Sequence, residues 1–174
     1  GPAQDTFDFK ATGASCGILR DAFTRYYGIV FRNTQSEWLQ TDELTAEFGG
    51  KKAWQTVLGM DVNVKSSNHT LSEDVDESYT LTIAAPRATI TAESVYGALY
   101  GLESFSQLVE RGSLVNGTTI KDEPRYKFRA VMIDTARHFY HKEVILQHLD
   151  AMAYAKMNVL HCTLPAPPPL ATRH

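Results

Sequence analysis

The sequence predicts an α+β domain, in which a sheet packs on helices, followed by the first strand–helix–strand unit of a parallel sheet. Three observations carry this prediction. Residues 79–83 alternate strictly between apolar and polar side chains, which is typical of a half-buried strand. Residues 18–30 and 93–110 repeat apolar side chains at helical spacing. After residue 122 the pattern becomes strand, helix, strand, and such a βαβ unit requires parallel strands.

The totals limit the classes of function. A chain of 174 residues with 43% hydrophobic content is long enough to bury a core. The net charge of −3 and the pI near 6.1 provide no basic field, so we expect no nucleic-acid partner. No apolar run approaches the roughly 20 residues of a membrane span, so no membrane span is expected. Residues 1–15 lack the apolar centre of a signal peptide, so we expect a processed start or a fragment.

The first domain begins with a short strand and a helix. Residues 7–10 alternate and predict the strand. The helix over residues 18–30 has Ser15 available as its N-cap. The pattern weakens from residue 33 to residue 52. Apolar and polar residues then alternate over 60–64, which predicts a second half-buried strand.

Further strands are expected on both sides of the second helix. The run 88–90 is expected to pair antiparallel with the strand at 79–83. Residues 114–120 contain Asn116-Gly117, the dipeptide that favours a tight turn between two antiparallel strands. The sequence therefore predicts a β-hairpin there.

The helix predicted over residues 93–110 carries two glycines on one patch. Gly97 and Gly101 are four residues apart and remove side chains from the same face, which indicates that a strand or helix packs closely against them. Gly112 is expected to end the helix.

Two sequons suggest a secreted or lysosomal glycoprotein. Asn68-His69-Thr70 lies in the polar segment 66–76, and Asn116-Gly117-Thr118 lies where a turn is expected. Asn68 and Asn116 are therefore candidate glycosylation sites.

Metal-binding patterns are missing from the sequence. Cys16 and Cys162 have no CxxC or Cys/His ligand spacing, and the sequence leaves both free thiols and a mutual disulfide open. The acidic cluster at residues 73–77 lacks the spacing and the glycine of a calcium-binding loop, so a solvated loop is the better interpretation.

The chain changes character at residues 122–124. We expect the α+β domain to occupy residues 1–122, the start of a parallel α/β domain to occupy 123–164, and a proline-rich irregular tail to occupy 165–174. In the second domain, a strand at 129–134, a helix at 142–156 and a strand at 157–161 form the βαβ unit.

A candidate site follows the strand at 129–134. Its apolar run 130–133 predicts a strand buried on both faces. Asp134, Arg137 and His138 come directly after this run. Ligand sites in α/β folds lie at the carboxyl ends of parallel strands, because the strand fixes the position of a loop that is open to solvent.

Five segments of the chain together resemble the β-N-acetylhexosaminidases of glycoside hydrolase family 20, including the lysosomal type. In chain order they are ILRDAFTRY (18–26), ESYTLTI (77–83), YGALYGLESFSQLV (96–109), DTARHF (134–139) and MAYAKMNVLH (152–161). The resemblance runs from about residue 7 to residue 161, and its motifs occur in the order of the family.

The resemblance implies a zincin-like, non-catalytic amino-terminal domain and a catalytic (β/α)8 TIM barrel, of which this chain holds the first βαβ unit. The chain has no His-Glu-x-x-His motif, so we expect no zinc or other metal, and no cofactor is implied. The implied partners are a glycan ending in N-acetylhexosamine and a homo- or heterodimer mate. The implied location is the lysosome or the extracellular space.

The resemblance also assigns roles to residues of the candidate site. Arg137 matches the family arginine that hydrogen-bonds the hydroxyls of the terminal sugar, which suits the fixed donor fork of a guanidinium. The alternative for Arg137 is a structural salt bridge to Asp134 or to a neighbouring loop. Asp134, His138 and His161 are possible supporting residues, with positioning or packing roles equally open.

The implied mechanism is substrate-assisted retention of configuration. The acetamido carbonyl of the substrate attacks the anomeric carbon, an aspartate orients that group, and a neighbouring glutamate protonates the leaving oxygen. The Asp-Glu pair belongs to a later barrel strand, so no catalytic residue is expected within this chain.

The resemblance stops after His161. Cys162-Thr163-Leu164 and the prolines that follow depart from the family, and a shifted reading frame, a retained intron or an alternative exon would explain so sharp a break. A closed barrel takes about 250 residues. We therefore expect a hexosaminidase fragment that is inactive alone. The alternatives are a non-enzymatic module for dimerisation or glycan binding, and a truncated product that is degraded from residue 126 onward.

Overall fold

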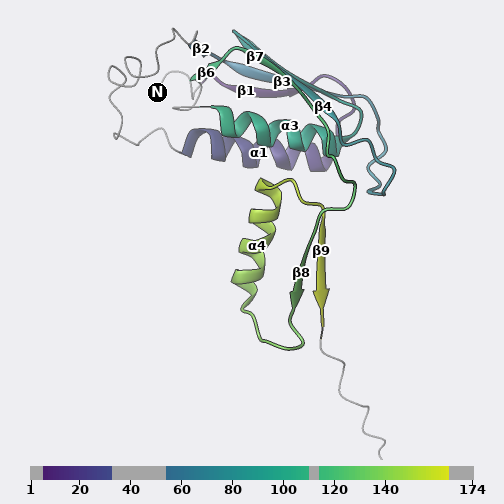
Figure 1. The fold of residues 1–174 in the computed structure, drawn as a ribbon. Helices are drawn as coiled ribbons and strands as arrows, with labels where there is room; N and C mark the ends of the chain where they lie inside the picture. The colour runs from purple at the N-terminus through teal and green to yellow at the C-terminus, as the bar shows by residue number, and fades with distance from the viewer. Residues whose placement is uncertain (1–5, 33–53, 110–113, 165–174) are drawn as a thin grey trace, which may run out of the picture. The chain divides into compact units, whose positions relative to one another are not determined.

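The computed structural model describes residues 6–32, 54–109 and 114–164. The chain divides into two compact units, Gly1–Pro124 and Arg125–His174 (Figure 1). The expected domain boundary after residue 122 lies two residues before this division. Within the described ranges, no helix is long and apolar enough to cross a membrane.

The described residues of the first unit form a five-stranded mixed sheet, a two-stranded sheet and two long helices. The strands of the five-stranded sheet occur in the order β1-β3-β5-β4-β7. β1 and β3 are parallel, as are β3 and β5, whereas β4 runs antiparallel to both of its neighbours. Its elements in chain order are β1 (Asp8–Ala11), α1 (Gly17–Arg32), β2 (Trp54–Thr56), β3 (Gly59–Val64), β4 (Tyr79–Ala84), β5 (Arg87–Ala92), α3 (Val95–Leu108), β6 (Leu114–Asn116) and β7 (Thr118–Asp122).

Alternation along the strands gives the sheet one apolar and one polar face. In β3, Met60, Val62 and Val64 are buried and alternate with half-buried Asp61 and Asn63. Because successive side chains point to opposite faces, one face of the sheet is apolar throughout its centre. Figure 1 shows α1 and α3 together on one side of the sheet, where they cover this apolar face. The half-buried strands and both helices expected from the sequence are confirmed.

The two helices are joined by a buried polar network. The hydroxyl of Tyr26 on α1 donates to Oε2 of Glu103 on α3 at 2.8 Å, and Nε2 of Gln107 donates to Oε1 of Glu103 at 2.8 Å. Tyr26 and Glu103 are each only 3% exposed. Burial, reinforced by the negative charge of Glu103, raises the pKa of the Tyr26 hydroxyl well above its usual range. The phenol therefore stays protonated and keeps donating to the carboxylate.

The close approach expected at the two helix glycines is confirmed. A Cβ on Gly97 would lie 2.3 Å from the backbone oxygen of Ser78, and one on Gly101 would lie 3.0 Å from a methyl carbon of Ile90. α3 ends at Leu108, where Val109 is extended. Gly112, the expected stop, lies outside the described residues.

The prediction of a hairpin at residues 114–120 is wrong. β6 pairs antiparallel with β2, whereas β7 pairs antiparallel with β4 in the other sheet. The tight hairpin turn needs positive φ at both central residues, and neither Asn116 nor Gly117 has it. Pairing with β4 places Ile120 of β7 opposite buried Leu81, a tertiary contact that outweighs the local preference of the turn.

The helix predicted over residues 18–30 starts at a different cap than expected. α1 begins at Gly17, and the backbone N–H of Arg20 donates to the carbonyl of Cys16, so Ser15 lies before the cap position. The segment 33–52 lies outside the described residues.

Arg87 links three neighbouring strands at one end of the sheet. Its Nη1 donates to Oδ1 of Asp8 on β1 at 2.6 Å, and its Nη2 donates to Oδ1 of Asp61 on β3 at 2.9 Å. Gly59 leaves the space for this side chain, because a Cβ there would lie 2.3 Å from Nη1. The hydrogen bonds and charge of Arg87 hold the pKa of Asp8 below its usual range.

The second unit is the predicted βαβ arrangement. β8 (Ala130–Asp134), α4 (Lys142–Tyr154) and β9 (Val159–Thr163) follow one another, and the two strands are parallel. The helix ends in two hydrogen bonds, from the N–H of Lys156 to the carbonyl of Ala153 and from the N–H of Met157 to the carbonyl of Met152. This termination is a Schellman motif, and it places Lys156 at φ 55°, in the left-handed region that favours glycine.

The prediction that β8 is buried on both faces is wrong. Ile133 is 8% exposed, whereas its neighbour Met132 is 62% exposed. Among the described residues of this unit, α4 is the one helix that can cover the two-stranded sheet, so one face of β8 stays open.

Candidate functional site

The loop after β8 begins at a firmly placed strand end. The N–H and Oγ1 of Thr135 both donate to the carbonyl oxygen of Thr163, at 3.1 and 2.6 Å, and so tie the ends of β8 and β9 together. Buried Ile133 anchors the strand one residue before the polar segment. The strand pair thus fixes where the loop starts.

Asp134 organises the first turn of this loop. Its Oδ1 accepts hydrogen bonds from the backbone N–H groups of Ala136 at 3.0 Å and Arg137 at 3.1 Å. Its Oδ2 lies 3.3 Å from Nε of Arg137. The salt bridge considered for Arg137 is therefore present, and Asp134 holds both the backbone and the side chain of Arg137.

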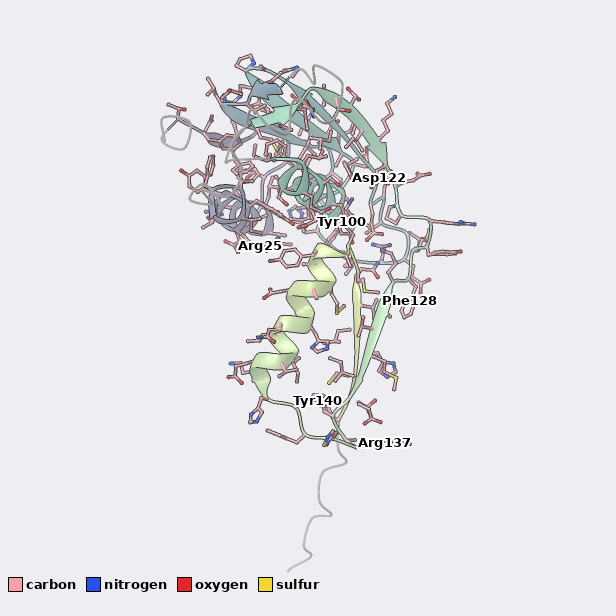
Figure 2. All side chains as sticks on the ribbon, turned by 60° about the vertical axis from the view of Figure 1, so that its left-hand side comes forward. Arg25, Tyr100, Asp122, Phe128, Arg137 and Tyr140 are labelled. Atoms are coloured by element: carbon pink, nitrogen blue, oxygen red, sulfur yellow. The ribbon has the colours of Figure 1, made fainter. Side chains whose placement is uncertain are left out.

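The ion pair leaves most of the guanidinium accessible. The side chain of Arg137 is 89% exposed, and water screens a pair of this kind so strongly that it adds little stability. In the described parts of the chain, the terminal nitrogens of Arg137 make no further ion pair. Figure 2 shows Arg137 and Tyr140 in the loop that joins β8 to α4. Asp134 thus holds Nε of Arg137, while the rest of the guanidinium is exposed to solvent and can donate hydrogen bonds.

The histidines occupy different places. His138 is exposed in the loop, and its ring contacts that of Tyr140 edge-to-face at 5.9 Å. His161 lies within β9 and is the register partner of Met132. Because side chains alternate along a strand, His161 lies on the same face as Met132 and Asp134. Parallel pairing therefore brings His161 to the face that carries Asp134, whereas His138 stays in the loop.

A small hollow lies beside the strand end. It measures about 170 Å³ and is lined by Ile133, Asp134, Tyr140, Val144 and His148 among others. Ligand pockets usually measure about 300–1,000 Å³, so this hollow alone does not enclose a ligand. The site around Arg137 is an open surface in this unit.

Among the described residues, no three His, Cys, Asp or Glu side chains are arranged so that they could hold a metal ion. Cys16 and Cys162 are both free thiols in the structure.

The sequons occupy different surroundings. Asn68 is exposed in a loop, and its Oδ1 accepts from the N–H of Thr70 at 3.0 Å. Asn116 is the last residue of β6 and is half-buried, so it lies in a strand and not in the turn that the sequence suggests.

Sequence reasoning missed two polar features of the first unit. These are the buried network around Glu103 and a hollow of about 390 Å³ at one end of the five-stranded sheet. The alternation over 79–83 marks Thr80 as outward-facing, which is one signal for the hollow. The register that brings its neighbours beside it depends on tertiary structure.

Comparisons with known proteins give two adjacent family matches. A family described as beta-acetyl hexosaminidase like matches residues 2–108, and the catalytic domain of glycosyl hydrolase family 20 matches residues 126–165.

Curated relatives match at substantial identity over most of this chain. Beta-hexosaminidase subunit beta of Homo sapiens is 41% identical over 157 residues, which cover 87% of this chain and 27% of the relative. Beta-hexosaminidase 3 of Arabidopsis thaliana is 38% identical over 160 residues, covering 86% of this chain and 29% of the relative. The chain therefore spans less than a third of these relatives.

Solved structures share the fold. Flavobacterium johnsoniae chitobiase superposes with a TM-score of 0.72 at 29% identity, covering 92% of this chain and 24% of the other. Streptomyces plicatus N-acetyl-beta-hexosaminidase superposes with a TM-score of 0.60 at 22% identity, covering 89% of this chain and 29% of the other.

Proposed function

The chain belongs to the β-hexosaminidases of glycoside hydrolase family 20, and we propose that it takes part in removing terminal, non-reducing β-linked N-acetylhexosamine from glycans. The observation that carries the proposal is the exposed guanidinium of Arg137, held at the carboxyl end of β8 by Asp134. The names of the relatives and of the Streptomyces enzyme support the substrate class.

In the proposed reaction Arg137 binds and the substrate supplies the nucleophile. The guanidinium donates to two vicinal hydroxyls of the terminal sugar, a geometry that its planar fork permits. The acetamido carbonyl oxygen then attacks the anomeric carbon, and the leaving oxygen takes a proton from a carboxylic acid. Asp134 keeps the arginine in place through the turn that it caps, and so acts as a positioning residue.

The 174-residue chain alone is proposed to be inactive, because the Asp-Glu pair of the mechanism belongs to a later strand. The assay is release of a chromophore from a chromogenic N-acetyl-β-glucosaminide by the purified chain. No release is expected. Release that disappears in Arg137→Ala would refute the proposed inactivity.

Sugar binding is tested separately from hydrolysis. N-acetylglucosamine titrated into the isotope-labelled chain should shift the amide resonances of the β8–α4 loop, and Arg137→Ala should abolish these shifts. Arg125→Ala is the matched control, since Arg125 is also exposed in this unit and stacks 5.6 Å from the ring of Tyr126. Equal loss of the shifts in both variants would contradict a specific role for Arg137.

A lysosomal or secreted location and a dimeric assembly are further parts of the proposal. Exposed Asn68 and the second sequon at Asn116 support passage through the secretory pathway. Several relatives are named as subunits, which supports a homo- or heterodimer. Expression in secreting cells should give a product whose gel mobility increases on treatment with an N-glycosidase.

A non-enzymatic module is the second candidate. The specific observation in its favour is the extensive core of the first unit, formed between the five-stranded sheet and the helices α1 and α3. Such a unit could act in dimerisation or glycan binding without the barrel. A monomeric hydrodynamic size together with no binding on a glycan array would contradict this candidate.

A further inference from the structure

One hollow in the first unit is large enough for a ligand and belongs to no site described above. It measures about 390 Å³, within the usual range for ligand pockets. Its lining includes Lys121, Thr80 and Thr91. The register places Lys121 of β7 opposite Thr80 of β4, and Thr80 opposite Thr91 of β5. These three residues therefore form one continuous row across three strands, on the polar face of the sheet.

The row offers hydrogen-bonding groups that the protein does not use. Thr80 and Thr91 are half-buried and Lys121 is exposed. Across the residues that the structure describes, neither hydroxyl and no part of the ammonium group has a hydrogen-bond or ion-pair partner. A ligand lying on the row would thus meet two hydroxyls and one ammonium at once.

One carboxylate beside the row is held in a fixed position, and a second lies on the opposite face of the sheet. The N–H of Ser78 donates to Oδ1 of Asp76 at 2.8 Å, and the hydroxyl of Tyr79 donates to Oδ2 of Asp122 at 2.9 Å. Figure 2 shows Asp122 where β7 leaves the sheet. Each carboxylate oxygen has more than one lone pair, so Asp76 can accept further hydrogen bonds. Asp122, the register partner of buried Tyr79, lies on the apolar face and is not an acceptor for the row. The hollow consequently combines donors and acceptors at short range.

The charges of the lining disfavour an anionic ligand. Two lysines and four carboxylates line the hollow: Lys65, Lys121, Asp76, Glu93, Asp122 and Glu123. Lys65 is already paired with Glu93 at 3.1 Å. The excess of negative charge repels phosphate, sulfate and carboxylate groups. The abundance of polar groups equally disfavours an apolar ligand.

We infer that this hollow is a saccharide subsite, in which a neutral sugar unit lies on the Lys121–Thr80–Thr91 row. A sugar ring presents alternating hydroxyls that both donate and accept, which matches such a lining. Tyr79 is only 4% exposed, so its ring provides no stacking surface for the sugar. Binding is therefore weak, with a Kd of about 1 mM or above. The subsite lies in the unit that does not contain Arg137.

The test is an amide-resonance titration of the full 174-residue chain with N,N′-diacetylchitobiose. The choice of this probe rests on the proposed function. The existence of the hollow does not depend on that function. Saturable shifts are expected at Thr80, Thr91 and Lys121. The double variant Thr80→Val/Thr91→Val keeps the shape and β propensity of both side chains and removes both hydroxyls, and it should raise Kd at least about fivefold, as expected for losing two neutral hydrogen bonds.

The matched control lies one row further along the same strands. Thr82 and Thr89 are also register partners, point to the same face and do not line the hollow. Thr82→Val/Thr89→Val should therefore leave Kd unchanged. Lys121→Met, at the edge strand, provides a second test if the double variant at the hollow fails to give a native spectrum, and it should also weaken binding.

The outcomes separate this inference from the proposed function. Shifts confined to the β8–α4 loop would support Arg137 and overturn the subsite. Shifts at the row that persist in Arg137→Ala would support the subsite, even if the proposed function failed. Absence of saturable shifts at the row, or equal weakening in both threonine double variants, would overturn the inference. N-acetylneuraminic acid, which is anionic, should produce no saturable shift at the row.

Discussion

Removing the hydroxyl of Tyr26 tests how strongly the two helices of the first unit depend on the buried network. Tyr26→Phe deletes a 2.8 Å hydrogen bond to a carboxylate and leaves that oxygen of Glu103 buried without its donor. A hydrogen bond to a charged group contributes about 1.5–3 kcal/mol, against about 0.5–1.5 kcal/mol for a neutral pair. We therefore expect Tyr26→Phe to lower the free energy of unfolding by about 2 kcal/mol.

A second tyrosine, Tyr96 on α3 of the same unit, provides the control. The hydroxyl of Tyr96 donates to the carbonyl of His69 at 2.8 Å, a bond of equal length to a neutral acceptor. Tyr96→Phe should therefore cost about 1 kcal/mol.

The assay is native-state hydrogen exchange at Leu81 and Ile90, which face each other in the centre of the sheet and report unfolding of this unit alone. A loss in Tyr26→Phe no larger than the loss in Tyr96→Phe would refute the reasoning, since it would mean that the charge of Glu103 does not strengthen its hydrogen bond.

Three other substitutions are expected to change the stability of the protein or its dependence on pH. Gly97→Ala should destabilise the first unit by about 1–3 kcal/mol in denaturant titrations, because the added carbon meets a backbone oxygen at 2.3 Å and neither backbone can yield easily. Lys156→Gly should stabilise the end of α4 by about 1 kcal/mol, measured as slower amide exchange there, since glycine adopts φ 55° without strain. The folded-state pKa of Asp8 lies below the unfolded value because of Arg87, so its stabilising effect is full above about pH 4 and is lost as pH falls through the lowered pKa. Asp8→Asn should accordingly flatten the acid limb of the unfolding free energy against pH, and an unchanged limb would contradict this assignment.

Much of the fold was predictable because it depends on local patterns. β3 and β4 alternate, and α3 repeats at helical spacing, because one face of each element is buried away from water. Burial of one face produces a pattern that can be recognised in consecutive residues. The close approach at Gly97 was also predictable, since a missing side chain on a helix face allows few other packing arrangements.

Pairing between distant segments was not predictable in the same way. The Asn116-Gly117 dipeptide predicted a hairpin, but β6 and β7 found partners in two different sheets. β7 instead forms five register pairs with β4 and places half-buried Ile120 against Leu81. The residues at 114–120 do not reveal that partner, because β4 is distant in the sequence.

Some features of the candidate site were likewise predictable from the sequence, and others depend on tertiary structure. The sequence by itself determined the family resemblance, the strand that ends at Asp134 and the choice of Arg137 as the sugar-binding candidate, because these depend on residue identity and short spacing. Only the tertiary structure decided that Asp134 braces Arg137, that His161 shares the face of Asp134, and that Lys121, Thr80 and Thr91 form one row. Those relations depend on strand register, which is fixed by the burial of whole elements and not by the residues that end up side by side.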